Sequence, residues 1–352
     1  MPSVLLTGYP GFLGSELLPR ILRRSNDIEA VCLVQPKFMA LADERRKASG
    51  LAERIRLIEG DITQPGLAPD MPDVAEIYHL AAIYDLSVRR DVGVRVNVEG
   101  TRNVLEFARQ CSALERVHYI STCYVSGRHR GLFLEDQLQT GQSFNNYYEE
   151  TKNLAEVEVR FAMHQGLPVT IYRPSVVVGD SATGATQKFD GPYYVIQWLM
   201  RQGHIAFLPV VGRPKKYRFN VVPRDFIVSA LDYLSGIPQS IGKTYHLADP
   251  EPLTVDETIN AIGEAIGRTI IRIPLPAEVA KASIKYVPGV YKLLRIPAPA
   301  VDYFVHPTEY DTTNTRADLA GSGIALPRLR DYLPHLIEFV RAHPEIGSAA
   351  MA

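Results

Sequence analysis

Two side chains four residues apart, Tyr148 and Lys152, have the types needed to move a proton. On a helix, a spacing of four places both side chains on one face. A tyrosine near its ordinary pKa of about 10 exchanges protons poorly at neutral pH, and a neighbouring ammonium group favours its phenolate form. The pair could therefore serve as a general acid or base. An exposed helix pair with no chemical role is the alternative, and other parts of the chain must decide.

Three glycines, Gly8, Gly11 and Gly14, fall between an apolar run and a helix-like segment in the sequence LLTGYPGFLG. This spacing permits a sharp turn, close approach of the backbone to a pyrophosphate, and a helix N-terminus directed at its charge. An ordinary tight turn is the alternative, but the chain continues as strand, helix and strand, which is the context that a dinucleotide site requires. We therefore predict a dinucleotide site, which favours the catalytic interpretation of Tyr148 and Lys152.

The elements that must position these residues alternate along the first half of the chain. Six strand-like runs are Ser3–Thr7, Ala30–Val34, Ile55–Glu59, Glu76–Leu80, Arg116–Ser121 and Pro168–Tyr172. Four helix-like stretches between or before them are Gly14–Arg24, Phe38–Ala48, Val94–Gln110 and Tyr147–Gln165. Such alternation predicts an α/β fold, a doubly wound parallel sheet of the Rossmann type.

The second half changes character after Val178, where a loop rich in glycine and threonine begins. Further elements are expected at Val195–Gln202 (helix), Thr244–Leu247 (strand), Val255–Ile266 (helix, capped by Thr254) and Leu329–Ala342 (helix). We predict a dinucleotide-binding domain over residues 1–178. Residues 179–345 are expected to form a smaller substrate-binding lobe, interleaved with the sheet at the rim where open α/β sheets bind ligands.

Composition narrows the function. The 352 residues are 46% hydrophobic and 22% charged, which is typical of a globular protein, and the net charge of −1 offers no field for nucleic acid. A small-molecule partner is therefore expected. Cys32, Cys111 and Cys123 are too scattered for a disulfide framework or a zinc site, and we expect no metal. Without a signal peptide or a long apolar run, the expected location is the cytoplasm.

The end of the second strand bears on which nicotinamide cofactor binds. A carboxylate there would favour NAD(H), but the sequence has Gln35, Pro36 and Lys37 and no acid before Asp43. Lys37, with Arg45 or Arg46, could instead meet the 2′-phosphate of NADP(H). Solvated charges on the next helix are the alternative, and NADP(H) is favoured over NAD(H).

The chain resembles the extended short-chain dehydrogenase/reductases over about residues 1–340 and is most similar to the branch of thioester reductases and fatty acyl-CoA reductases. The matching motifs are TGYPGFLG, YHLAAIYDLSV, NVEGTRNVLEFA, STCYVSG, YYEETKNLAE and RPSVVVGDSATG. The resemblance implies an oxidoreductase that transfers hydride to the carbonyl of an acyl thioester, aldehyde or ketone. The branch usually carries a basic residue where Gln35 stands. No adenylation or carrier domain is recognised, so the carbonyl substrate is expected to arrive ready-made.

The same resemblance assigns roles to individual residues. Tyr148 is the general acid/base, Lys152 orients the ribose and lowers the pKa of Tyr148, and Asn97 supports the site. Thr122, five residues before Gly127, is expected to hydrogen-bond the substrate oxygen, with Ser121 as its rival. Predicted cofactor contacts, combining the turn, the strand ends and the strand beside the nicotinamide, are Gly8, Gly11, Phe12, Leu13, Gly14, Lys37, Asp61, Ile62, Ala81, Ala82, Tyr148, Lys152, Pro174, Ser175 and Val176.

The substrate is left between classes. An aromatic cluster (Phe189, Tyr193, Tyr194 and Trp198) and the apolar stretch Val279–Ile296 are expected to roof an apolar pocket, favouring an acyl or aliphatic carbonyl. Basic residues, above all Arg213 and Arg218, keep open a nucleotide-sugar epimerase or dehydratase, and a hydroxysteroid-type dehydrogenase would use the same three catalytic residues. A sensor without turnover is a third alternative, which the intact catalytic set disfavours.

Two surfaces bear on partners. The basic stretch Val279–Arg295 could touch a membrane, although a solvated surface segment is favoured. Val94–Gln110 and Tyr147–Gln165 could pair across a two-fold axis, as in other members of this superfamily, so a homodimer is left open.

Overall fold

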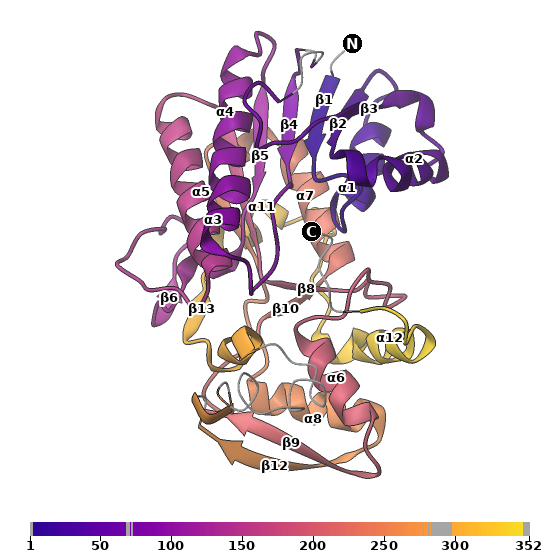
Figure 1. Cartoon of the computed structure of the whole chain (residues 1–352), viewed down its shortest axis with the longest axis vertical. Helices are drawn as coiled ribbons and strands as arrows, with labels where there is room; N and C mark the ends of the chain where they lie inside the picture. The colour runs from indigo at the N-terminus through magenta and orange to yellow at the C-terminus, as the bar shows by residue number, and fades with distance from the viewer. Residues whose placement is uncertain are drawn as a thin grey trace.

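The computed structural model describes residues 3–67, 71, 73–276, 278–280, 282 and 298–347. A seven-stranded parallel sheet fills its upper half (Figure 1), in the order β11-β7-β5-β4-β1-β2-β3. Its strands are β1 (Ser3–Thr7), β2 (Glu29–Val34), β3 (Ile55–Glu59), β4 (Glu76–His79), β5 (Arg116–Ile120), β7 (Val169–Pro174) and β11 (Thr244–Leu247). The order reverses between β1 and β4, and open sheets bind ligands at such a switch point. The predicted fold class is confirmed.

Helices cover both faces of the sheet because alternate strand residues face opposite cores. In β1, Val4 and Leu6 pack toward one core and Leu5 toward the other. The first core is covered by α1 (Gly14–Arg23), α2 (Met39–Ala48), α7 (Arg224–Gly236) and α11 (Thr313–Leu319). The second is covered by α5 (Tyr147–His164) and by the continuous run α3 (Arg90–Gly93), π-helical η3 (Val94–Glu99) and α4 (Gly100–Gln110).

A smaller lobe lies below the sheet in Figure 1 and has its own apolar core. Its helices are α6 (Pro192–Met200), α8 (Val255–Ile266) and α12 (Leu329–Ala342). Three parallel two-stranded ribbons pair β9 (Ile205–Val211) with β12 (Thr269–Leu275), β8 (Val176–Val178) with β10 (Val221–Pro223), and β6 (Gly131–Phe133) with β13 (Thr308–Tyr310). Single 3-10 turns are η1 (Pro36–Phe38), η2 (Ala52–Arg54), η4 (Cys123–Ser126), η5 (Pro238–Ser240) and η6 (Ala298–Val305).

Several expected elements are present, and others were missed. Thr254 caps α8 in a complete capping box, as predicted. The sequence reasoning missed α7, β9, β10 and β12, and it assigned the strand 244–247 to the lobe, whereas β11 pairs with β7 in the main sheet. The domain boundary at residue 178 stays a prediction. The stretch 279–296 lies outside the described residues, apart from residues 279, 280 and 282. No described helix is long and apolar enough to cross a bilayer.

Candidate active site

Thr122 and Tyr148 meet at the carboxyl edge of the sheet. Thr122 lies two residues after the end of β5, and Tyr148 is the second residue of α5, whose N-terminus is capped by Asn146. Both side chains are buried; burial raises the pKa of Tyr148, and its interaction with the Thr122 hydroxyl opposes that rise. Ser121 faces elsewhere, since its hydroxyl donates to Glu156 Oε2 at 2.7 Å. The geometry therefore favours Thr122 over Ser121 as the substrate contact.

Lys152 lies one helical turn after Tyr148 and is 3% exposed. Its Nζ donates to the Ile120 carbonyl at 2.8 Å and to Tyr119 Oη at 3.0 Å. Burial lowers the pKa of Lys152 to about 7, opposed by the charge of Glu156. The ammonium is thus held at the strand end next to Thr122 by neutral oxygens, and its charge is sensitive to pH near neutrality.

The glycine turn leaves room only for backbone. Gly8 has a φ of +89°, and a Cβ there would lie 2.8 Å from the Ala81 nitrogen. A Cβ at Gly11 or Gly14 would lie 2.6 or 2.9 Å from the Gly8 carbonyl oxygen. Among the described residues, no side chain caps the N-terminus of α1 at Leu13, where the Ser15 N–H donates to the Gly11 carbonyl at 3.0 Å. The positive end of this helix therefore faces the turn, where an anion would bind.

The strand predicted to pass beside the nicotinamide adjoins the catalytic pair. Pro174 accepts a hydrogen bond from the Thr122 hydroxyl at 3.4 Å, and Val176 donates its N–H to the Asn220 carbonyl at 3.3 Å. Between them, the Ser175 hydroxyl is buried and has no partner among the described residues. A buried hydroxyl without a partner, together with the tight glycine turn, fits a bound dinucleotide that would complete the polar contacts.

The predicted adenosine contacts cluster at the ends of β2 and β3. Gln35 Nε2 donates to Asp61 Oδ2 at 2.8 Å, and the Thr63 N–H donates to Asp61 Oδ1 at 2.9 Å. Asn103 Nδ2 donates to the Ile62 carbonyl at 2.8 Å. The Gln35 amide therefore binds the Asp61 carboxylate.

The three candidate cations take different positions. Lys37 is exposed and lies over the neighbouring Phe38 ring at 4.9 Å. Arg46 forms an ion pair with Asp43 at 2.6 Å. Arg45 reaches the glycine turn.

Arg45 Nη1 donates to Ser15 Oγ at 2.8 Å and to the Pro10 carbonyl, and the amide group of Gln187 faces the same guanidinium. Of the three cations, Arg45 is the one in contact with the glycine turn.

Asn97 connects two elements of the site through hydrogen bonds. Asn97, in the π-helical turn, accepts from the Ile83 N–H at 2.9 Å and donates to Thr151 Oγ1 at 3.0 Å. It therefore joins the loop that follows Ala81 and Ala82 to helix α5, in agreement with its expected supporting role.

Two further groups beside Tyr148 escaped the sequence reasoning. The Tyr84 ring packs edge-on against the Tyr148 ring at 5.0 Å, and the Lys188 ammonium lies 3.7 Å above Tyr84 while pairing with Asp190 at 2.7 Å. Burial raises the pKa of Glu149 to about 7 despite hydrogen bonds from Asn145. Tyr84 and Glu149 lie in the motifs YHLAAIYDLSV and YYEETKNLAE, whereas Lys188 lies in none of the matching motifs.

The predicted aromatic roof is largely wrong. Phe189 and Tyr193 are fully buried in the lobe core, where their rings pack at 5.1 Å. Trp198 donates its ring N–H to the Phe207 carbonyl at 2.8 Å, on the side of β9. Their apolar character reflects packing of the lobe, which the sequence pattern alone does not distinguish from a pocket lining.

The loop after β8 is anchored at several points. The Ser181 hydroxyl donates to Asp225 Oδ2 at 2.6 Å on α7, and the Ser181 carbonyl contacts His335 Nδ1 at 2.7 Å on α12. Gly184 packs against the His335 carbonyl, where a Cβ would lie 2.2 Å away. The segment that leads to Lys188 is therefore fixed to both the sheet layer and the lobe. Among the described residues, no group of three His, Cys, Asp or Glu could hold a metal ion.

A Rossmann sheet with a glycine turn at its switch point and a Thr–Tyr–Lys set at its carboxyl edge defines an extended short-chain dehydrogenase/reductase, a class of NAD(P)-dependent oxidoreductases. The chain belongs to the Male sterility protein family, which it matches over residues 6–231. The predicted thioester-reductase and fatty acyl-CoA reductase branch is confirmed. Its relatives include reductase domains of nonribosomal peptide and polyketide synthases and aldehyde reductases.

Similarity to individual proteins supports the same family. The chain is 29% identical to a linear gramicidin synthase protein of Brevibacillus parabrevis over 283 residues, which are 74% of this chain and 5% of that protein. It is similar to the terminal R domain of the myxalamid pathway, with 28% identity, a TM-score of 0.83, and coverage of 99% and 93% of the two chains.

Fold similarity extends to UDP-glucuronic acid 4-epimerase of Bacillus cereus, with 19% identity, a TM-score of 0.69 and coverage of 99% of each chain. The chain spans less than two fifths of the length of the curated relatives it matches.

Proposed function

We propose that the protein reduces the carbonyl of an acyl thioester or aliphatic aldehyde with NADPH, using Tyr148 as the general acid. The observation that carries this proposal is that the Thr122 hydroxyl and the Tyr148 phenol, both buried, lie together beside Pro174. Two hydroxyl groups that meet at the carboxyl edge of the sheet can both bind one carbonyl oxygen.

The residues divide the work as follows. Thr122 and Tyr148 hydrogen-bond the carbonyl oxygen, and Tyr148 gives it a proton from its phenol as negative charge develops there. The Lys152 ammonium favours the resulting phenolate and holds the nicotinamide ribose. A bound nicotinamide cofactor supplies the hydride. Burial of Thr122 and Tyr148 strengthens both hydrogen bonds because water does not compete.

The NADP preference is proposed to depend on Arg45 more than on Lys37. Arg45 already lies on the glycine turn, and a guanidinium binds phosphate oxygens in a fork. We expect Arg45→Gln to weaken NADPH binding about tenfold, the effect of one lost charge-assisted hydrogen bond, and to change NADH binding less. Lys37→Glu, in the turn after β2, should shift the preference toward NADH more weakly. Calorimetric titration measures both, and equal dissociation constants for NADPH and NADH in the wild type would contradict the preference.

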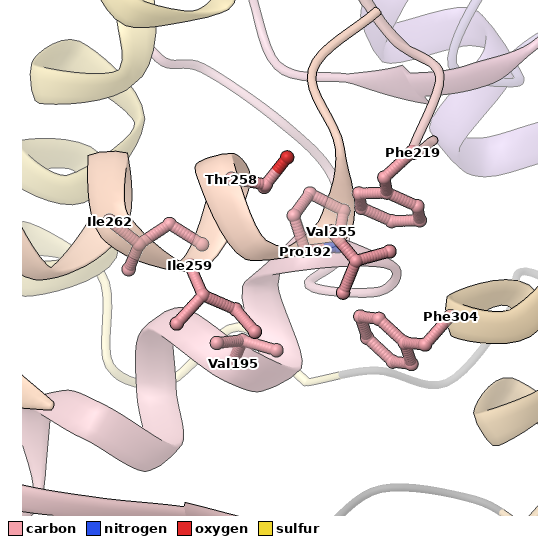
Figure 2. A pocket seen from close by; sticks show the side chains of 8 residues that line it. All are labelled: Pro192, Val195, Phe219, Val255, Thr258, Ile259, Ile262 and Phe304. Carbon is pink, nitrogen blue, oxygen red and sulfur yellow. The ribbon is translucent and has the colours of Figure 1, made fainter. Parts of the chain in front are cut away.

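The acyl substrate is supported by the apolar lining of the lobe near the site. Phe304 belongs to this lining, and the adjacent Tyr303 packs against Tyr124 at 4.4 Å, two residues after Thr122. Between α6, α8 and η6 the lining encloses a void of about 10 Å³ (Figure 2), which has room for about one water molecule and is formed by Pro192, Val195, Phe219, Val255, Thr258, Ile259, Ile262 and Phe304. An acyl chain that enters here must move these side chains apart, and it would gain about 0.8 kcal/mol for each methylene it buries.

The nucleotide-sugar alternative is weaker. It needs two arginines that clamp a diphosphate, and Arg218 is already held by the Pro252 carbonyl at 2.7 Å and by Glu309 at 4.0 Å. Arg213 alone does not make such a clamp.

The deciding experiment measures NADPH oxidation with acyl-CoAs and aldehydes of two to sixteen carbons, ketosteroids and UDP-sugars. We expect kcat/KM to rise up to about fourfold per methylene over part of the series. Ile259→Phe, which places a larger side chain in this apolar lining, should move the optimum to shorter chains, whereas Ala265→Phe on the exposed side of α8 should not. A flat response to chain length, or turnover confined to UDP-sugars or ketosteroids, would contradict the proposal.

A further inference from the structure

We infer that His79 is a positioning residue, which fixes Lys152 through a chain of buried hydrogen bonds that begins at the glycine turn. The inference rests on the proposed function, in which Lys152 assists Tyr148 and holds the ribose. His79 ends strand β4 at the switch point of the sheet and is 2% exposed.

On the lysine side, the contacts pass through Tyr119 and Thr101. Lys152 Nζ donates to Tyr119 Oη at 3.0 Å. The Tyr119 phenol interacts with the Thr101 hydroxyl, the Tyr119 ring lies 5.7 Å from the His79 ring, and Thr101 Oγ1 lies 3.0 Å from His79 Nε2. Tyr119, Thr101 and His79 come from β5, α4 and β4, so the chain crosses from the helix layer into the sheet.

On the cofactor side, His79 Nδ1 lies 2.7 Å from Thr7 Oγ1. Thr7 is fully buried, immediately precedes Gly8, and accepts a hydrogen bond from the Ala81 N–H at 3.2 Å. The same histidine therefore contacts the strand that leads into the glycine turn and the threonine that serves Lys152.

The directions of these hydrogen bonds leave one consistent arrangement. Thr101 donates its only hydroxyl proton to the Asn97 carbonyl at 2.6 Å, so toward His79 Nε2–H and the Tyr119 phenol its oxygen can only accept. His79 Nδ1 is then bare and accepts the Thr7 hydroxyl proton. Burial lowers the pKa of His79 to about 3, reinforced by the charge of Lys152, which agrees with a neutral ring.

The arrangement explains how Lys152 is directed. The Tyr119 phenol gives its proton to Thr101, so only its lone pairs face Lys152, and the ammonium is held as a donor. The titratable groups around Lys152 are Tyr119 on β5, His79 on β4, and Tyr148 and Glu156 on α5. Loss of the Thr101 hydroxyl frees Tyr119 to turn, and Lys152 then loses a fixed acceptor and deprotonates at lower pH.

The test uses a matched set of threonine variants of the full chain. Thr101→Val removes the hydroxyl with little change in shape, Thr101→Ser retains it, and Thr170→Val removes another fully buried hydroxyl, which donates to the Ser240 carbonyl at 2.9 Å away from the site. We expect Thr101→Val to lower kcat/KM about tenfold, the effect of one lost hydrogen bond, and to move its alkaline limb to lower pH. Thr101→Ser should restore both quantities, and Thr170→Val should alter thermal stability alone.

Tyr119→Phe provides an independent variant, because it removes the acceptor of Lys152 and leaves the His79 contacts intact. It should shift the pH profile in the same direction. An unchanged profile in both Thr101→Val and Tyr119→Phe, or an equal loss of kcat/KM in Thr170→Val, would overturn the inference.

Titration of NADPH affinity against pH follows Lys152 without turnover. As the pH is raised, the NADPH affinity should begin to fall at a lower pH in Thr101→Val than in the wild type. If no carbonyl is reduced by the wild type, the proposed function fails, while this shift in the binding profile still supports the role of His79, and its absence refutes that role.

Discussion

At the scale of single residues, the proton donor is the position most open to test. Tyr148→Phe keeps the ring that packs against Tyr84 and removes the phenol oxygen. We expect turnover to fall by about 10²–10⁴-fold, the usual contribution of a positioned proton transfer, while NADPH affinity stays within about twofold. Steady-state kinetics and calorimetry give the two quantities. A loss below tenfold would assign the proton to another group.

Lys152 should lower the stability of the chain without cofactor. Its pKa falls from 10.5 unfolded to about 7 folded because of burial, so between these values the unfolded chain binds more protons and stability rises with pH. Lys152→Met should therefore raise Tm at pH 7 by at least about 2 °C, with a gain that shrinks toward pH 10, and should abolish turnover. Thermal scans across this pH range make the measurement. A gain that does not depend on pH would show that the charge is not its cause.

Residue types and spacing predicted Tyr148, Lys152 and the glycine turn as candidates, but they could not choose between Ser121 and Thr122. Successive side chains of a strand point to opposite faces, so one of two adjacent hydroxyls must turn away from the site. Which one turns depends on Glu156 and Pro174, both distant in sequence. Lys37 and Arg45 illustrate the same limit, because both are basic and only the fold brings Arg45 to the turn.

At the scale of elements, a buried ion pair fastens helix α5 to strand β7. Glu156 and Arg173 are both fully buried, and their side chains meet at 2.6 Å. Although burial opposes it, the Arg173 guanidinium holds the pKa of Glu156 at about 2. The stabilising effect is present above the unfolded pKa near 4.5 and is lost as pH falls toward 2.

Removing one member of this pair leaves the other charge buried. We expect Glu156→Gln to lower the free energy of unfolding by about 3–5 kcal/mol at pH 7. Glu158→Gln on the same helix breaks only a surface pair with Arg102 at 2.7 Å and should cost less than about 1 kcal/mol. Urea denaturation compares the two variants. Similar losses in both would refute the special role of the buried pair.

Local patterns located many elements because strands and helices differ in apolar period, and the predicted helix Leu329–Ala342 matches α12 in full. Helix α7 was missed although Phe226, Ile227 and Leu231 have helical spacing, and its partner α1 lies some two hundred residues away. The pairing of β11 with β7 is equally non-local, and parallel pairing gives no short-range turn signal.

At the scale of the whole molecule, helices α4 and α5 lie together on one side of the sheet. Phe161 on α5 is 58% exposed there, and a large exposed apolar side chain can mark an interface. We expect a homodimer through this face, with Phe161→Glu giving a single chain of 39.2 kDa in light scattering. Leu132→Glu, at another exposed site, should leave the mass doubled. A wild-type protein that is monomeric at all concentrations would contradict this prediction.

The return of α7 and β11 to the sheet has a practical consequence for engineering. A chimera that exchanges everything after residue 178 with a homologue would also exchange an edge strand and the helix that packs on α1. The contact of β11 with β7 and the contact of α7 with α1 would then each join surfaces from two different proteins. A graft confined to residues 179–223, 248–307 and 320–347 would keep α7, β11, β13 and α11 of the host in place, provided the donor supplies a hydroxyl that can reach Asp225. We therefore expect substrate preference in this architecture to be transferable as three segments, and not as one.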